Sequence, residues 1–312
     1  MNNLSADVKK LGLVGDHSES VLRPEYIDKI CLEVAIDEAL RRGINDGAEA
    51  ESFLKTYQID FLPRVKLVDG VSPLRQVEML YADGKIGLLE AEGHLLNNPL
   101  GLKDCVATID DIRKTFRELF GLDLPECGFS VSSFCNENSL EGYGIVRGEN
   151  EVQLMHGKPG LMMSGAVAHE LGHAWAHANS PMERIRVKMF DDLYENIEAE
   201  NYDELSDDHD SFDWDCRILS EGFAVLTHSL YAQNLDNRRN TSIHSDYFNS
   251  LIRVYHKMDK LDYGVDWDNP YVIGFGLVNK IYTSRGFGGV VDVIKRAESL
   301  DDVRREVGEN EL

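Results

Sequence analysis

The feature that most constrains the fold is an almost wholly apolar segment, residues 159–181, with three polar residues near its centre. These are His169, Glu170 and His173, in the pattern His-Glu-x-x-His. The surrounding alanine, leucine, methionine and tryptophan residues indicate a buried helix, and a proline stands at each end, where a helix can begin or stop. A buried helix has to satisfy its imidazole and carboxylate groups, and a metal ion does so directly.

The spacing of the two histidines favours one shared metal ion. Residues four apart on a helix lie about 40° apart around its axis, so both imidazoles leave the same face. Two neutral nitrogens at this spacing can bind one Zn²⁺. Glu170 lies about 100° round from His169, where its carboxylate can reach a metal-bound water without binding the metal. We therefore predict His169 and His173 as zinc ligands and Glu170 as the catalytic base; a core helix with hydrogen-bonded histidines is the alternative.

A catalytic zinc site needs a third protein ligand and an open fourth position. Glu221 is the best candidate, because it lies in the mainly apolar segment 218–226, where a buried carboxylate needs a cation. The alternative is an ordinary carboxylate at a helix start. His177 is the rival ligand, but it lies about 80° from His169 around the helix axis, so we interpret it as a supporting or surface residue.

A zinc hydrolase also needs a donor that stabilises the oxyanion formed during the reaction. His228 and Tyr231 follow Glu221 by seven and ten residues, which places them on the same face of a helix. Tyr271 and Arg285 come from a later segment. We name His228 and Tyr271 as candidate catalytic residues, and a purely structural role is the alternative for each.

Residues 165–175, together with Glu221-Gly222 downstream, resemble the peptidase domain of DA1-like proteins. The glycine-rich segments 274–280 and 286–291 are similar to the C-terminal helices of that family, so the resemblance covers residues 127–298. It implies a zinc metallopeptidase of the gluzincin type, with two histidines and a glutamate as ligands and the motif glutamate as base. Plant members carry a glutamate directly before the ligand glutamate, where this chain has a serine.

The expected fold class is α+β: a zincin-like domain, predominantly helical, with a small sheet beside the motif helix. Residues 129–134 and 151–156 have strand patterning. We expect the second strand at a sheet edge, where an extended peptide substrate could pair; an ordinary core strand is the alternative. We divide the chain into an N-terminal, mostly helical region, 1–125, and a metallopeptidase domain, 126–312, with an acidic insertion at about 190–215.

The acidic insertion contains acidic side chains but no lysine or arginine. Residues 191–215 contain twelve Asp or Glu and no Lys or Arg. We interpret the stretch as a solvated insertion. A Ca²⁺ site within 207–215 and a flap over the active site are alternatives, because hard oxygen ligands gather there. In the N-terminal region, apolar periodicity predicts helices over about 23–55 and 109–120, and a weak strand over 61–68.

Charge and composition limit the classes of partner that we expect for this chain. The net charge of −23 argues against nucleic acid and anionic membranes, since both repel an acidic surface. A protein or peptide substrate is compatible with it. The five cysteines are widely spaced without a Cys-x-x-Cys pair, which favours reduced thiols. We find no signal peptide and no apolar run long enough to span a bilayer, so we expect a cytoplasmic protein.

The predicted activity is hydrolysis of peptide bonds by a zinc-activated water, with Glu170 as general base. One alternative is a regulatory peptidase of the ImmA/IrrE type, acting on a repressor-like partner, because a His-Glu-Leu-Gly-His helix is common in that class too. The other is a non-catalytic protein whose zinc is structural, in which a fourth protein ligand replaces the water.

Overall fold

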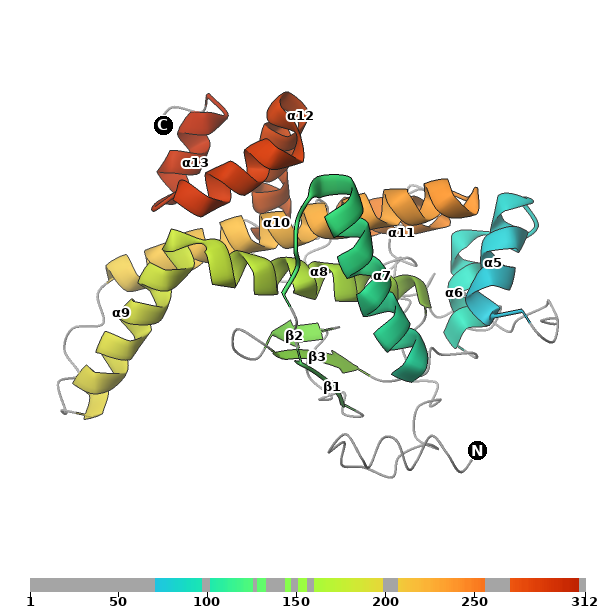
Figure 1. The fold of residues 1–312 in the computed structure, drawn as a ribbon, viewed down its shortest axis with the longest axis horizontal. Helices are drawn as coiled ribbons and strands as arrows, with labels where there is room; N and C mark the ends of the chain where they lie inside the picture. The colour runs from blue at the N-terminus through green and yellow to red at the C-terminus, as the bar shows by residue number, and fades with distance from the viewer. Residues whose placement is uncertain are drawn as a thin grey trace, which may run out of the picture.

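The structure, a computed structural model, describes residues 71–96, 102–125, 128–132, 144–146, 151–155, 160–198, 207–255 and 270–308 (Figure 1). The helix and strand predicted within 23–55 and 61–68 lie outside the described residues. The described helices are α5 (Pro73–Ala82), α6 (Leu88–Leu96), α7 (Leu102–Phe120), α8 (Gly160–Asn179), α9 (Pro181–Glu198), α10 (Asp207–Arg239), α11 (Ile243–Tyr255), α12 (Pro270–Arg296) and α13 (Leu300–Glu306). The described strands are β1 (Gly128–Ser132), β2 (Gly144–Val146) and β3 (Glu151–Met155).

Helices α8 and α10 form the centre of the fold. They run side by side along the long axis, with the strands on the far side of α8 and α12 against α10 (Figure 1). Leu171 of α8, Phe223 of α10 and Val278 of α12 are buried in one hydrophobic core. The two central helices approach closely at Gly172, where a Cβ would lie 2.9 Å from the Cα of Ala224. A side chain at this position would force α8 and α10 apart.

A second close approach joins α10 to α12. A Cβ on Gly222 would lie 2.3 Å from the carbonyl carbon of Gly274, and a Cβ on Gly274 would lie 2.0 Å from the carbonyl oxygen of Ile218. The two glycines therefore let the backbones touch. Farther along α12, Gly286 has φ 69° and ψ −175°, which breaks the regular helix. Glycine adopts this left-handed φ without steric cost, so the chain can turn here toward α13.

Helix α7 packs on the same core as the central helices. Phe116 is fully buried, and its ring lies 5.9 Å from that of Phe287 on α12. The helix predicted over 109–120 is thus confirmed, although it begins earlier, at Leu102. The region before residue 125 and the region after it share this hydrophobic core.

Helices α5 and α6 pack against α11 and the first turn of α8. Leu161 of α8 is buried with Val77, Leu95 and Ile243 in a smaller core. Beside it, the fully buried Glu78 carboxylate accepts a hydrogen bond from Arg239 and lies 2.9 Å from Nε2 of His244. Arg239 at the end of α10 and His244 at the start of α11 thereby offset the cost of burying the charge of Glu78 on α5.

The expected α+β class is wrong. Among the residues whose side chains the structure describes, 86% are helical and none lies in a strand. The strands are described as backbone alone, and they are five, three and five residues long. The described interior is built by helix-on-helix packing, because apolar stripes of α7, α8, α10 and α12 cover one another. The part of the chain whose side chains the structure describes is therefore helical.

The position expected for the strand at 151–156 is also wrong. The strand order is β1-β3-β2, so β3 lies in the middle. It pairs in parallel with β1, with Gly128 opposite Glu151, and antiparallel with β2, with Val146 opposite Val152. Because neighbours take both of its backbone edges, β3 cannot receive an extended peptide.

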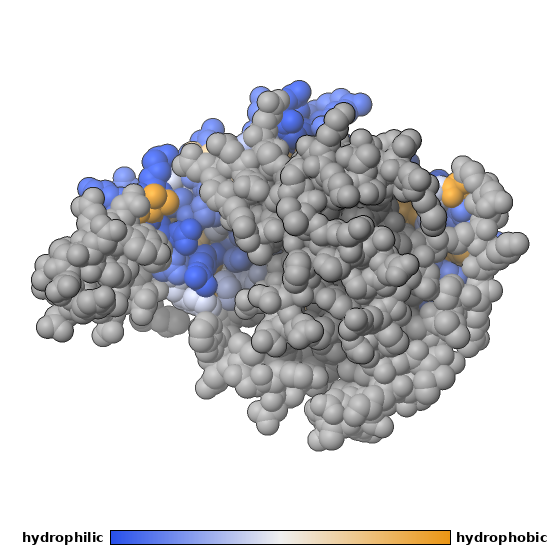
Figure 2. Space-filling model, turned by 90° about the horizontal axis from the view of Figure 1, so that it is seen from below, coloured by the Kyte–Doolittle hydropathy of each residue, from blue (hydrophilic) through white to orange (hydrophobic). Residues whose placement is uncertain are grey.

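The two ends of the acidic stretch are helical. Residues 191–198 belong to α9 and 207–215 to α10; the residues between them lie outside the described ranges. Asp213 pairs with Arg186 of α9 and Arg217 of α10, at 2.9 and 2.8 Å. The face in Figure 2 shows mostly hydrophilic described residues, with small separate apolar patches. None of the described helices is long and apolar enough to cross a membrane.

Candidate metal centre

Three of the predicted site residues meet at the contact between α8 and α10. His169 and His173 leave α8 one turn apart, and Glu221 faces them from α10. One ligand atom from each residue lies within 4.8 Å of the other two. The Nε2 atoms of the histidines are 3.0 Å apart, and Oε2 of Glu221 lies 3.1 Å from that of His169 and 3.2 Å from that of His173. The three form a nearly equilateral triangle.

This triangle fits a tetrahedral zinc ion. With zinc–ligand bonds of about 2.0–2.1 Å, two ligands of a tetrahedral ion are about 3.3 Å apart. The observed separations are only slightly shorter. Oε2 of Glu221 is also buried and has no hydrogen-bond partner, although the two ring nitrogens lie close to it. A buried carboxylate oxygen without a donor is costly unless a cation compensates it.

The second ring nitrogen of His173 has its own partner. Nδ1 of His173 lies 2.7 Å from the hydroxyl oxygen of Ser220, which is buried on α10 directly before Glu221. When Nδ1 carries the proton and donates to this oxygen, Nε2 is left with a lone pair that points at His169 and Glu221. This is the tautomer that a metal needs.

The electrostatics of the cluster follow from burial and from its mixed charges. Burial lowers the pKa of His173, but the Glu221 carboxylate outweighs it and raises that pKa to about 9. Burial raises the pKa of Glu221, but His173 and His169 hold it well below its ordinary value. The carboxylate is therefore ionised, and without a metal a proton on His173 balances its charge; a bound metal cation would take the place of that proton.

Glu170 lies beside the cluster without belonging to it. The residue is 7% exposed, and burial raises the pKa of its carboxyl above the ordinary value. His169 and His173 lower this pKa in part. A carboxylate with a raised pKa accepts a proton more readily near neutral pH, which is what a general base requires.

The two candidate oxyanion donors lie in different surroundings. Tyr271, at the start of α12, stacks on His169 with ring centroids 5.8 Å apart and planes at 22°. His228 is buried between α8 and α11: its ring lies 5.0 Å from that of Phe248, and a Cβ on Gly165 would lie 2.2 Å from its Nε2. Burial lowers the pKa of His228 to about 3, so its ring is neutral. The structure thus brings Tyr271 against a member of the triad, whereas His228 packs on Phe248 and Gly165, although it lies close enough to His169 for that residue to lower its pKa further.

His177, the rival ligand, points to another partner. Its Nδ1 lies 3.2 Å from Oε2 of the buried Glu183, the third residue of α9. Arg186 donates to the same carboxylate oxygen at 3.0 Å. The ring of His177 also contacts that of His173, with centroids 6.3 Å apart. His177 therefore connects the triad to α9.

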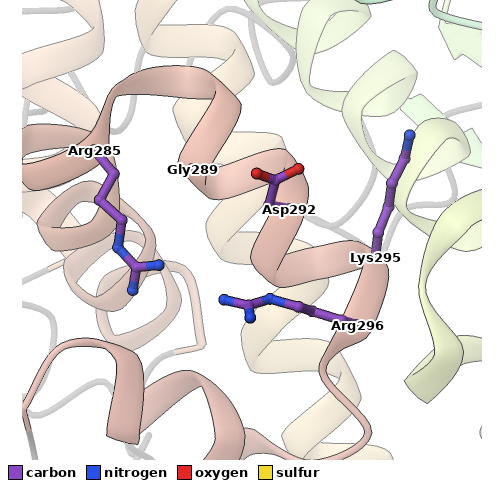
Figure 3. Close-up of a pocket in the computed structure, with 5 residues that line it drawn as sticks. All are labelled: Arg285, Gly289, Asp292, Lys295 and Arg296. Carbon is purple, nitrogen blue, oxygen red and sulfur yellow. The ribbon is translucent and has the colours of Figure 1, made fainter.

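Among the described residues, the triad is the one group of His, Cys, Asp or Glu whose ligand atoms converge as a metal site requires. The Ca²⁺ site considered within 207–215 has no such group in the described part of the chain. A cavity of about 610 Å³ lies elsewhere, on α12, and is lined by Arg285, Gly289, Asp292, Lys295 and Arg296 (Figure 3). It contains no member of the triad; Arg285, considered above as an oxyanion donor, lies there and pairs with Glu306.

The sequence missed two contributors to this site. Ser220 carries no motif signal, and only its place before a candidate ligand could have drawn notice. Glu183 stands directly after the helix break, where a carboxylate usually caps a helix start. No family model, curated protein or solved structure in the comparisons matches the chain.

Proposed function

We propose that this chain is a zinc-dependent metallopeptidase that hydrolyses peptide bonds, with His169, His173 and Glu221 as metal ligands. The observation that carries the proposal is the convergence of their three ligand atoms within 4.8 Å. His169 and His173 come from one helix and Glu221 from another, and 52 positions of sequence separate His169 from Glu221. The composition of the set, two imidazoles and one carboxylate, is that of catalytic rather than structural zinc sites, which favour cysteines.

A zinc ion bound there would polarise a substrate carbonyl and make a bound water acidic enough to be deprotonated near neutral pH. Glu170 accepts the proton of that water and later delivers it to the leaving amine, which its raised pKa supports. Tyr271 is our candidate for the oxyanion donor, because it lies against His169. His228 is the second candidate for that role, and its ring packs on Gly165 and Phe248.

The resemblance to DA1-like peptidases belongs to the same proposal and rests on the motif residues and Glu221-Gly222. The proposed substrate is a protein or peptide, and the acidic composition disfavours nucleic acid and anionic membranes as partners. The proposed compartment is the cytoplasm. The buried, free thiol of Cys216, whose pKa is raised to about 12 by burial, is compatible with a reducing compartment.

The test of the proposed reaction is Glu170→Gln, which keeps the size of the side chain and removes its ability to accept a proton. We expect the variant to fold and retain zinc, and to cleave peptides at least about 100-fold more slowly than the wild type. Glu118→Gln, on the exposed face of α7, is the control and should cleave normally. Undiminished cleavage by Glu170→Gln would remove Glu170 from the mechanism.

Two further outcomes separate the alternatives. A zinc ion that can be removed only with loss of the fold, and that supports no cleavage, would indicate a structural site. A proteome-wide cleavage comparison of the wild type with Glu170→Gln identifies the substrate. A single DNA-binding repressor as the cleaved protein would identify a regulatory peptidase.

A further inference from the structure

Ser220 contacts His173, one of the proposed metal ligands. Its hydroxyl oxygen lies 2.7 Å from Nδ1 of His173, a short distance for a nitrogen–oxygen hydrogen bond. The serine is 6% exposed, so water competes little for this contact. Ser220 is also the immediate neighbour of Glu221 on α10, so two consecutive residues of one helix contact His173 from two sides.

The chemistry of the imidazole assigns a direction to this hydrogen bond. A neutral imidazole carries one N–H and one lone pair, and a metal takes the lone pair. Nε2 of His173 faces His169 and Glu221, at 3.0 and 3.2 Å. When zinc is bound there, the lone pair is at Nε2, and the remaining proton is on Nδ1, where it donates to Ser220.

We propose that Ser220 is a positioning residue for the metal centre: it accepts the Nδ1–H of His173 and so fixes the tautomer and the ring orientation in which Nε2 binds zinc. The inference rests on the proposed function, because it assumes that His173 is a ligand. Without the acceptor, His173 can rotate or carry its proton at Nε2, and either change removes a ligand. Loss of such a partner typically weakens metal affinity 10–100-fold.

The experiment compares zinc affinity, measured by competition with a chromogenic chelator, in the wild type, Ser220→Ala, Ser220→Thr and Ser229→Ala. Ser229 is the matched control: it lies on the same helix, is also 6% exposed, and its hydroxyl accepts a hydrogen bond from Gln233 rather than from a ligand. We expect Ser220→Ala to bind zinc 10–100-fold more weakly, whereas Ser220→Thr and Ser229→Ala retain affinities within about threefold of the wild type.

A direct readout on the wild type avoids any dependence on the folding of a variant. In zinc-loaded protein with ¹⁵N-labelled histidine, His173 should show a slowly exchanging proton on Nδ1. A proton that exchanges with solvent as fast as that of an exposed histidine would overturn the inference, and so would an unchanged zinc affinity in folded Ser220→Ala.

The inference and the proposed function fail differently. If Glu221→Gln loses zinc but Ser220→Ala keeps it, the metal centre stands and the role of Ser220 is wrong. If the wild type binds no zinc, the proposed function itself is wrong, and the inference falls with it.

Discussion

The close contact between Gly222 and Gly274 gives a sharp test of how α10 and α12 are assembled. In Gly274→Ala the new Cβ would lie 2.0 Å from the carbonyl oxygen of Ile218, which is 1.4 Å short of the 3.4 Å where ordinary contact begins. The obstructing atoms are backbone and cannot rotate away, so the helices have to separate. Overpacking of this kind costs about 1–3 kcal/mol. The separation also moves Tyr271, one turn earlier on α12, away from His169.

Gly276→Ala is the matched control, since it makes the same change two residues later on the same helix. A Cβ there meets nothing within 4 Å, so the variant should gain about 0.5–1 kcal/mol from the helix preference of alanine. Urea denaturation followed by circular dichroism should therefore rank Gly276→Ala above the wild type and Gly274→Ala below it. Equal stability of the two variants would refute the close contact.

Further predictions concern stability and pH. Glu78→Gln should destabilise the fold by about 2–4 kcal/mol in urea denaturation. This loss is smaller than that from breaking a fully buried ion pair, because Arg239 is 35% exposed. The exposed control Glu118→Gln should cost under about 0.5 kcal/mol. The pKa of Glu78 is lowered, since His244 and Arg239 outweigh burial, so this stabilisation is present above the ordinary pKa of 4.5 and is lost as the pH falls below it. The pKa of His228 is lowered from 6.5 to about 3, chiefly by burial. As the pH falls below 6.5, His228 therefore becomes protonated in the unfolded chain while it stays neutral in the folded protein. His228 should therefore cost the fold about 2 kcal/mol at pH 5 relative to pH 7, and His228→Gln should lack this loss in unfolding free energy.

Local patterns predicted the parts of this molecule that depend on neighbours in sequence. The helix around the His-Glu-x-x-His motif was expected between two prolines and runs from Gly160 to Asn179. Strand patterning found β1 and β3, because alternation is local as well. The order of the strands is not local: β1 pairs directly with β3, although β2 lies between them in sequence, and no alternation pattern encodes that partner.

The fold class failed for a related reason. Short strands next to the motif helix suggested an α+β domain, but the described interior depends on long-range contacts between helices, such as the one at Gly222 and Gly274. Glu221 could be selected because a carboxylate in an apolar segment needs a cation. Ser220 could not, since a buried serine is ordinary and its partner lies 47 residues away.

The metal centre is best tested by the zinc content of the purified, zinc-loaded protein after exhaustive dialysis, measured by mass spectrometry. We expect one zinc ion per wild-type chain, loss of the ion from Glu221→Gln, and retention by Glu118→Gln, which changes an exposed carboxylate on α7. A wild type without zinc, or a Glu221→Gln variant that holds the ion as tightly as the wild type, would contradict it.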